Sequence, residues 1–341
     1  MATLTRASER HARAVASGPM TATPVDLDID AVFHQHRREL TGYCYRMLGS
    51  GAEAEDAVQE TLVRAWKAAD RFEGRSSVRS WLYRIATNVC VDMHRAPQRR
   101  ARPMHFGTSQ KADDAVLNER PPETWVQPIA DSRVLPEDGD PAALAEARES
   151  IRLAFVAALQ HLPARQRAVL ILCEVLKWKA VEVAELLDTS VASVNSALQR
   201  ARATLAAADL QRLDDPVDPE HQALLARYVD AFERYDMKAL AALLRDDVVM
   251  SMPPWDLWLE GPDQVVAWMT GRGCGCEGSR LVPIAVNGLA GFGSYRKVGP
   301  NRWEPWAIQV LEVADGKIIG HNNFVYPELF AELGLPPHLE G

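Results

Sequence analysis

Apolar residues recur at helical spacing through two stretches of the chain, residues 27–102 and 144–208. In the first stretch, the run AEAEDAVQETLVRAWKAADRF forms one apolar stripe from Ala57, Val58, Leu62, Ala65 and Trp66. Its charged residues lie mainly outside that stripe, which is the pattern of a helix with one buried face. Both stretches therefore predict bundles of amphipathic helices.

The last part of the chain, residues 217–341, changes from helical to strand-like patterning. Two amphipathic helical runs come first, and β-branched and aromatic runs bounded by turn residues follow. The expected strands are Val248–Met252, Leu281–Val286, Gly291–Lys297, Trp306–Val313 and Lys317–Phe324. Asp315-Gly316 is a hairpin turn signal. Helices followed by antiparallel strands predict an α+β fold with a curved sheet shaped as a cone.

Charge is distributed unevenly along the chain. The net charge of −8 by itself argues against nucleic-acid binding. However, residues 71–102 hold eight arginines and two acidic residues, whereas residues 217–341 hold seventeen acidic and ten basic residues. Residues 103–143 are acidic and contain several prolines, which predicts an extended linker. A basic surface is therefore expected within the first helical stretch.

The chain start and the cysteines bear on where the protein works. Residues 1–26 lack the apolar core of a secretory signal, so a disordered tail is expected, and no apolar run approaches the roughly 20 residues that span a bilayer. The cysteines show no disulfide framework, which fits a reducing cytoplasm; they are Cys44, Cys90, Cys173, Cys274 and Cys276. For Cys274-Gly275-Cys276, a glycine-rich loop is favoured over a metal or redox site. We expect no metal and no cofactor.

The first helical stretch resembles region 2 of the extracytoplasmic-function (ECF) sigma factors. The runs AEDAVQETLVRAW and RFEGRSSVRSWLYRIATNVCVDMHR match that region in order, spacing and residue type. The resemblance implies docking on the clamp of the largest polymerase subunit through Asp56, Gln59, Glu60 and Arg64. It also implies melting and reading of the −10 promoter element by Arg75, Ser76, Ser77, Arg84, Asn88, Asp92 and Arg95. From periodicity alone, a merely solvated face is the alternative for the first set.

The second helical stretch contains a helix-turn-helix pattern in VEVAELLDTSVASVNSALQRAR. Residues 188–190 form the turn, and Ser190 can cap the second helix. The longer run from Leu162 to Leu205 resembles sigma region 4, whose second helix enters the major groove at the −35 element. The residues expected to touch DNA there are Ser193, Asn195, Ser196, Gln199, Arg200 and Arg202. Asn195 and Gln199 are the best candidates for base contacts.

This chain departs from the family at two positions of that motif. Asp188 stands where the family usually has glycine, and Asp tolerates the left-handed conformation better than most residues, so the turn should persist. Asn195 stands where the family usually has a basic residue, which could shift promoter preference.

Residues 217–341 resemble SnoaL-like domains of the NTF2-like superfold, which are appended to a subset of actinobacterial sigma factors. The resemblance rests on ALLARYVDAFERYDMKALAALLRDDVVMSMPP and FVYPELFAELGLP. Relatives of this fold include enzymes, so a ligand pocket could be lined by Asp247, Trp255, Trp258, His321 and Asn323. For His321 and Asp247, ordinary structural roles are the favoured interpretation. In sigma relatives the linker threads toward the RNA exit channel, where Glu137, Asp138 and Asp140 could mimic nucleic acid.

These resemblances together imply a multidomain, cytoplasmic, non-enzymatic protein without a membrane partner. The expected parts are an all-α sigma region 2, an acidic linker, an all-α helix-turn-helix region 4 and an α+β NTF2-like cone, at residues 27–102, 103–143, 144–208 and 217–341. It would bind promoter DNA and core RNA polymerase, through the clamp of the largest subunit and the flap of the second-largest subunit. The cone would modulate initiation in cis by contacting regions 2 and 4. The alternatives are an NTF2-like isomerase or hydrolase fused to a DNA-binding module, and a helix-turn-helix repressor, which leaves the basic, aromatic first module unexplained.

Overall fold

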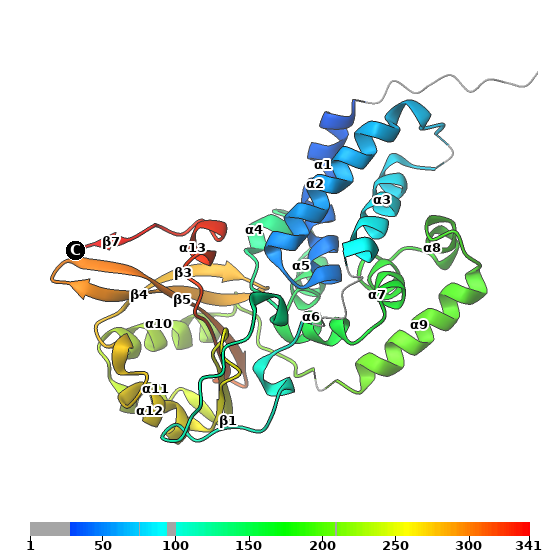
Figure 1. Cartoon of the computed structure of the whole chain (residues 1–341). Coiled ribbons are helices and arrows are strands. Elements are labelled where there is room, and N and C mark those ends of the chain that lie inside the picture. The colour runs from blue at the N-terminus through cyan, green and yellow to red at the C-terminus, as the bar shows by residue number, and fades with distance from the viewer. Residues whose placement is uncertain (1–27, 75, 94–99, 209) are drawn as a thin grey trace, which may run out of the picture.

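The computed structural model describes residues 28–74, 76–93, 100–208 and 210–341. Figure 1 shows α1–α9 on one side of the molecule and the sheet with its helices on the other. The expected tail, residues 1–26, lies outside the described residues. In the described part, no helix combines the length and apolarity that crossing a membrane requires. The all-α modules and the α+β domain expected from the sequence are confirmed.

The first helical module consists of α1 (Ile29–Leu48), α2 (Gly51–Ala68) and α3 (Val78–Met93), with a 3₁₀ turn at Ala69–Arg71. Gly49 ends α1 in the left-handed conformation at φ 76°, and Ser50 then caps α2 by accepting a hydrogen bond from Glu53 N. The three helices bury a common core that includes Leu40, Tyr43, Ala57, Leu82 and Ala86.

The second helical module consists of α5 (Pro141–Glu149), α6 (Leu153–Gln160), α7 (Ala164–Leu170), α8 (Ala180–Leu186) and α9 (Val191–Ala206), with a π turn at Ile171–Val175. Helix α5 begins inside the stretch that was expected to be linker. The Asp140 side chain accepts a hydrogen bond from Ala143 N, and Pro141 suits the first turn, so the helix starts there.

The C-terminal domain is a curved sheet covered by helices. Its helices are α10 (Pro219–Glu233), α11 (Met237–Ala241), α12 (Pro262–Thr270) and α13 (Leu329–Glu332), with a 3₁₀ turn at Cys274–Cys276. Its strands are β1 (Leu244–Ser251), β2 (Trp258–Glu260), β3 (Arg280–Val286), β4 (Leu289–Gly299), β5 (Arg302–Ala314), β6 (Lys317–Phe324) and β7 (Leu339–Glu340). The strand order is β2-β1-β6-β5-β4-β3, with β7 paired to β5. Among the described strands of this sheet, β1 and β6 pair in parallel and the other pairs are antiparallel.

The acidic stretch between the helical modules is extended for much of its length, but it is packed against its neighbours. It contains α4 (Asp131–Val134) and 3₁₀ turns at Pro103–His105 and Pro122–Thr124. Gln110 N donates to Trp258 O, and Arg120 N donates to Pro254 O, both at 3.0 Å. Figure 1 shows this teal segment running alongside the C-terminal domain. The composition of this segment is that of a free spacer, but backbone hydrogen bonds hold it against the C-terminal domain.

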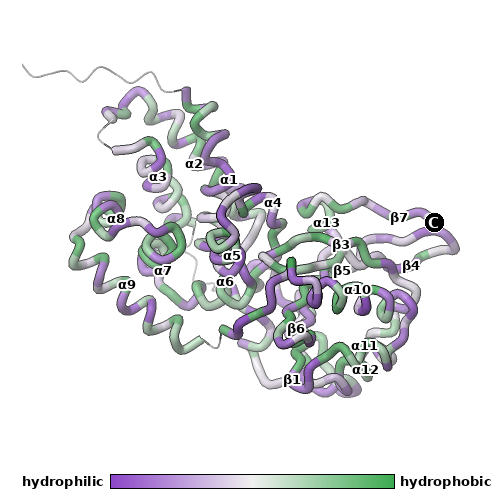
Figure 2. The backbone as a smooth tube through the Cα atoms, turned by 180° about the vertical axis from the view of Figure 1, so that it is seen from behind, coloured by the Kyte–Doolittle hydropathy of each residue, from purple (hydrophilic) through white to green (hydrophobic). Residues whose placement is uncertain are grey.

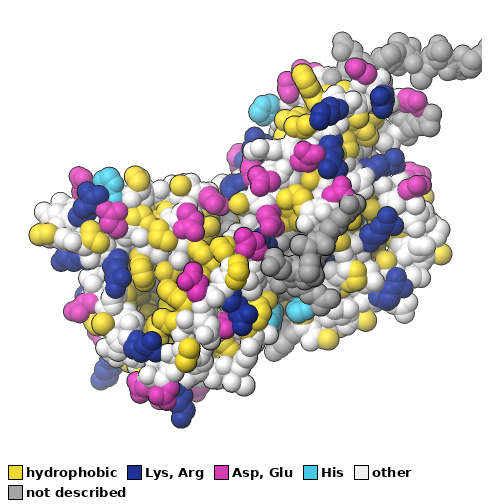
Figure 3. Space-filling model, viewed as in Figure 1, with side chains coloured by type: hydrophobic (Ala, Val, Ile, Leu, Met, Phe, Trp, Pro, Cys, Tyr) yellow, Lys and Arg dark blue, Asp and Glu magenta, His cyan; other side chains and the backbone are white. Residues whose placement is uncertain are grey.

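One apolar core continues from the helical modules into the C-terminal domain. It joins helix residues to Trp125 and Ile129 of the linker, and to Val286 and Tyr295 of the sheet. A second core lies inside the cone and includes Ala112 and Ala115 of the linker. In Figure 2, β5 and β6 include hydrophobic stretches, and in Figure 3 hydrophobic side chains gather on the visible face of the C-terminal domain. The helical modules and the cone consequently share buried surface.

Candidate functional site

Helix α2 carries the residues predicted to face a protein partner. Asp56, Gln59 and Glu60 are exposed, and Arg64 is half-buried. The Arg64 guanidinium donates to Glu60 at 2.7 Å and to Asp92 of α3 at 3.2 Å. These residues therefore form one polar surface that continues from α2 onto α3.

Trp66 was expected on the buried stripe of α2, and that expectation is wrong. Its side chain is 68 % exposed, and Val63 beside it is 44 % exposed. Gln59, Val63 and Trp66 follow the i, i+4, i+7 spacing of a second helix face, opposite the buried Ala54, Val58 and Thr61. Exposed large apolar residues grouped in this way mark interaction surfaces.

The loop before α3 and the helix itself hold the residues predicted to read the −10 element. Arg75 and Arg95 lie outside the described residues. Ser76 is half-buried, and Ser77 caps α3 by accepting a hydrogen bond from Ser80 N at 3.1 Å. Arg84 and Asn88 are exposed on α3, whereas Asp92 is engaged with Arg64.

The second helical module covers part of α3. Trp178, just before α8, packs against Tyr83 with ring centroids 5.1 Å apart, and the Arg79 guanidinium lies 5.1 Å above the Trp178 ring. Arg84 donates to the Glu185 carbonyl of α8 at 2.8 Å. The buried Arg167 of α7 donates to the Met47 carbonyl of α1. The two modules are thus closed against each other.

Helix α9 presents every residue predicted for the −35 element to solvent. Ser193, Asn195, Ser196, Gln199, Arg200 and Arg202 are all exposed. Val194 and Ala201 are buried on its inner face, and Ser190 caps the helix, as expected. Asp188 adopts the left-handed conformation at φ 49°, which confirms the expected turn geometry. Arg202 pairs with Glu174, so it is less free than Asn195 or Gln199. Figure 2 shows α8 and α9 at the molecular edge away from the cone.

A hairpin turn of the C-terminal domain contacts both helical modules and the linker. Asn287, between β3 and β4, donates to Tyr45 Oη at 2.6 Å and to the Ile151 carbonyl at 2.7 Å, and accepts from Ile129 N at 3.0 Å. The next residue, Gly288, donates to Asp131 at 2.8 Å. Burial raises the pKa of Asp131 to about 6. No hairpin signal was identified at this turn from the sequence, although Asn-Gly is typical of such turns.

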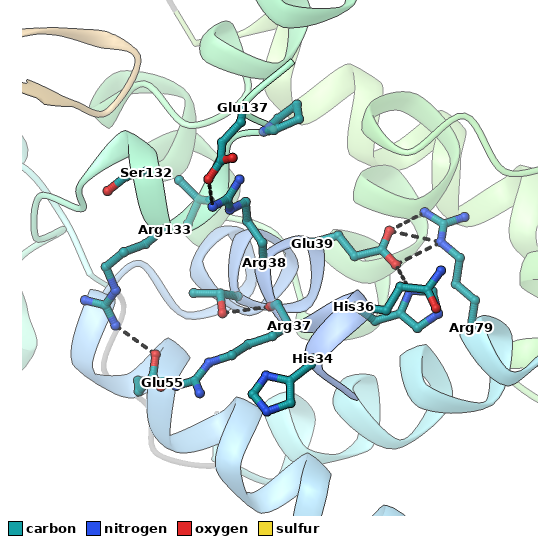
Figure 4. Close-up of a pocket in the computed structure, with 14 residues that line it drawn as sticks. His34, His36, Arg37, Arg38, Glu39, Glu55, Arg79, Ser132, Arg133 and Glu137 are labelled. Carbon is teal, nitrogen blue, oxygen red and sulfur yellow. Dashed lines mark hydrogen bonds and ion pairs between the residues drawn. The ribbon is translucent and has the colours of Figure 1, made fainter. Parts of the chain in front are cut away.

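A charged pocket of about 1050 Å³ lies between α1, α3 and the linker (Figure 4). Glu55 pairs with both Arg37 and Arg133, Arg38 pairs with Glu137, and Arg79 pairs with Glu39. Sequence reasoning missed this network because its members come from separate elements. The pairs tie α1 and α2 to the linker, and they engage Glu137, one of the three linker carboxylates expected from the sequence to mimic nucleic acid.

The five residues expected to line a pocket in the cone do not converge on one place. Trp255 and Asn323 line a cavity between the sheet and α12. His321 is buried and bonds Tyr228 Oη at 2.7 Å, and burial lowers its pKa to about 4. Trp258 donates to the Gly107 carbonyl of the linker. Asp247 pairs with Arg245 and lines a different cavity, so the cluster expected from the sequence does not form as a unit.

Two helical modules, the second with a helix-turn-helix, define a sigma-type transcription factor, and the comparisons agree. The Sigma-70 region 2 model matches residues 32–100, the Sigma-70 region 4 model matches residues 152–205, and the SnoaL-like domain model matches residues 225–321.

The chain belongs to the ECF RNA polymerase sigma factors. It is 42 % identical over 320 residues to ECF RNA polymerase sigma factor SigG of Mycobacterium tuberculosis, covering 92 % of this chain and 85 % of that protein. It is 27 % identical to SigJ of the same organism, over 87 % of this chain and 92 % of that protein. The crystal structure of M. tuberculosis SigJ shares the fold, with a TM-score of 0.57 at 24 % identity, covering 90 % of this chain and all of that one. As a family member, the chain binds core RNA polymerase and promoter DNA.

Proposed function

We propose that α2 docks on the clamp of the largest polymerase subunit through Asp56, Gln59, Glu60 and Arg64, with Val63 and Trp66 as the apolar centre of the contact. The observation that carries this assignment is the exposed Trp66, because tryptophan is the residue type most enriched among interface hot spots. Region 4 contacts the flap of the second-largest subunit.

The test is the affinity for core polymerase, measured by fluorescence titration. Trp66→Ala should weaken binding by at least about tenfold, since truncating a hot-spot residue removes about 2 kcal/mol or more. Val298→Ala is the matched control, because Val298 is 58 % exposed on the C-terminal domain, away from α2. Equal losses in both variants, or none in either, would contradict the assignment.

Promoter reading is assigned to two surfaces. Residues of α3 and the preceding loop read the −10 element; they are Asn88, Arg75, Ser76, Ser77, Arg84, Asp92 and Arg95. The exposed face of α9 reads the −35 element, with Asn195 and Gln199 touching base edges and Ser193, Ser196, Arg200 and Arg202 holding the backbone. The exposure of all six α9 residues supports this second assignment.

A promoter library transcribed by the chain with core polymerase tests the α9 assignment. Asn195→Ala and Gln199→Ala should change which −35 sequences are used, with each lost base contact worth about 1–3 kcal/mol. Thr204→Ala, on the same helix beyond the proposed contacts, should leave preference unchanged. Unaltered preference in the first two variants would refute the base-contact roles.

The cone acts as a regulator in cis, and its His321 has a structural role. The contacts of Asn287 with α1 and with the turn between α5 and α6 support the regulatory role, and the bonding of His321 to Tyr228 supports the structural one. We assign residues 27–102 to sigma region 2, 103–143 to the acidic linker, 144–208 to sigma region 4 and 217–341 to the cone. The protein acts in the cytoplasm, without a membrane partner. Removing residues 209–341 should change promoter-dependent transcription, and unchanged transcript yield would contradict the regulatory role.

A further inference from the structure

The cavity that Trp255 and Asn323 line has the size and wall of a small-molecule site. It occupies about 270 Å³ between the sheet, α12 and the linker. Met250, Met252, Phe232 and Trp268 make much of the wall apolar. An apolar cavity of about 150 Å³ already holds benzene, so this one has room for one or two rings with a polar substituent.

The charged groups at this cavity are all positive. Arg296 and Arg272 line it, and no Asp or Glu does so among the residues that the structure describes. The Arg296 guanidinium stacks on Trp306 at 4.5 Å and donates through Nε to the Gly275 carbonyl at 2.7 Å. Within the described chain neither arginine has a carboxylate partner. A guanidinium carries five N–H donors, so most of those on Arg296 stay available to a ligand.

The glycines of the Gly-Cys-Gly-Cys loop are explained by this arrangement. A Cβ atom added at Gly275 would lie 1.5 Å from Nη2 of Arg296, and one added at Gly273 would lie 2.5 Å from Nε1 of Trp268. The Arg296 and Trp268 side chains therefore leave room only for glycine at positions 275 and 273. Burial raises the pKa of Cys276 to about 11, so this thiol stays neutral and adds no negative charge to the cavity.

Neutral donors complete the polar part of the wall. Ser294 is 1 % exposed, and its hydroxyl has no hydrogen-bond partner among the described residues. Gln309 accepts from Tyr228 Oη through Oε1 at 2.8 Å, which leaves its amide NH₂ without an acceptor in the described structure. Both residues line the cavity, so their free donors can serve a ligand that supplies acceptor atoms.

We propose that this cavity binds a small carboxylate with a flat apolar body, whose carboxylate pairs with Arg296 and accepts hydrogen bonds from Ser294 and Gln309. A planar carboxylate matches the planar fork of a guanidinium, and the aromatic and methionine wall matches a ring. The linker takes part, because Leu117 lines the cavity and the Ala115 carbonyl accepts a hydrogen bond from Arg272. The bound carboxylate therefore touches the linker, which joins the two DNA-reading modules. Only a link between this binding and transcription rests on the regulatory function proposed above.

Binding is tested on the full-length chain alone, so the result is independent of polymerase and promoter. The probe is 2-naphthoate, followed by calorimetry and by quenching of tryptophan fluorescence. Saturable binding is expected, with the neutral 2-naphthalenemethanol at least about tenfold weaker and inorganic phosphate not competing. Equal binding of acid and alcohol, competition by phosphate, or no binding of either naphthalene would overturn the proposal.

Two variants locate the site. Arg296→Gln and Ser294→Ala should each weaken naphthoate binding, the first by about tenfold to a hundredfold, with the alcohol unaffected. Arg280→Gln is the matched control, because Arg280 stacks on Trp303 at 4.1 Å outside the cavity. Naphthoate should also slow amide exchange at residues 115–117 and 272–276 but not along α9. Full affinity in both variants, or protection confined to other segments, would place the ligand elsewhere.

Discussion

Asn287 is the residue through which the cone is tied to both helical modules. It is fully buried, adopts the left-handed conformation at φ 54°, and uses both side-chain atoms in hydrogen bonds. Asparagine tolerates this conformation better than most residues, and its amide offers donors and an acceptor together. One side chain therefore satisfies backbone groups of the linker and of the second helical module, and a tyrosine of α1.

Replacing Asn287 with Asp keeps the shape but removes the amide donors. The new carboxylate would face the Ile151 carbonyl, so Asn287→Asp should lower the free energy of unfolding by about 2–4 kcal/mol. Thermal unfolding measures the loss. Asn301→Asp is the control, since Asn301 is exposed. Similar melting temperatures for the two variants would mean that the Asn287 bonds contribute little.

His321 should make the protein sensitive to acid. Its pKa of about 4 in the folded state lies below the unfolded value near 6.5, so stability is fully present above pH 6.5 and is lost as pH falls toward 4. The loss should approach about 3 kcal/mol. Urea unfolding of the wild type and of His321→Gln between pH 7 and 4 isolates the effect. Asp131 acts in the opposite sense but is present in both proteins, and parallel curves would contradict the prediction.

At the scale of elements, most helix and strand boundaries follow from capping and turn residues. Strand β6 coincides with the expected Lys317–Phe324, and Ser190 caps α9 as expected. The face that a helix buries is less predictable, because α2 has apolar residues on two faces and only one of them packs inward. Periodicity detects an amphipathic helix, but it does not say which apolar residues meet a neighbour within the same chain.

The α8–α9 turn provides a test at this scale. Asp188 holds a left-handed conformation that glycine adopts without strain. We expect Asp188→Gly to match or exceed the wild type in stability, and Asp188→Ala to be less stable than Asp188→Gly by about 1 kcal/mol. Denaturant unfolding followed by circular dichroism gives the comparison. Identical stability of the two variants would show that the turn conformation is not under strain.

At the scale of the whole molecule, the two DNA-reading modules are closed against each other. The −10 and −35 elements are separated by roughly 25 base pairs, on the order of 80 Å of B-form DNA. Modules joined through Trp178, Arg84 and Arg167 cannot lie at both elements at once. Binding to polymerase and promoter must therefore separate them, and the hydrogen bonds of Asn287 also have to be accommodated or broken.

Weakening the closed contact should open the free protein. Trp178→Ala removes the ring that packs on Tyr83 and lies under Arg79, so the radius of gyration measured by small-angle X-ray scattering should increase. Trp66→Ala removes an equally large but exposed ring, and should leave the radius unchanged. An unchanged radius for a folded Trp178→Ala protein, checked by circular dichroism, would argue against a closed form held by this residue.

The amino-acid sequence by itself determined the family, the helical modules, the turn at Asp188 and the order of the five main strands, but not β2, β7 or α4. These depend on local periodicity, capping and turn chemistry, which neighbouring residues specify. Only the tertiary structure decided the exposure of Trp66, the docking of the acidic linker, the three partners of Asn287 and the arginine-lined cavity. Each of these joins residues far apart in the chain, and which distant surfaces meet is set by packing that local patterns do not encode.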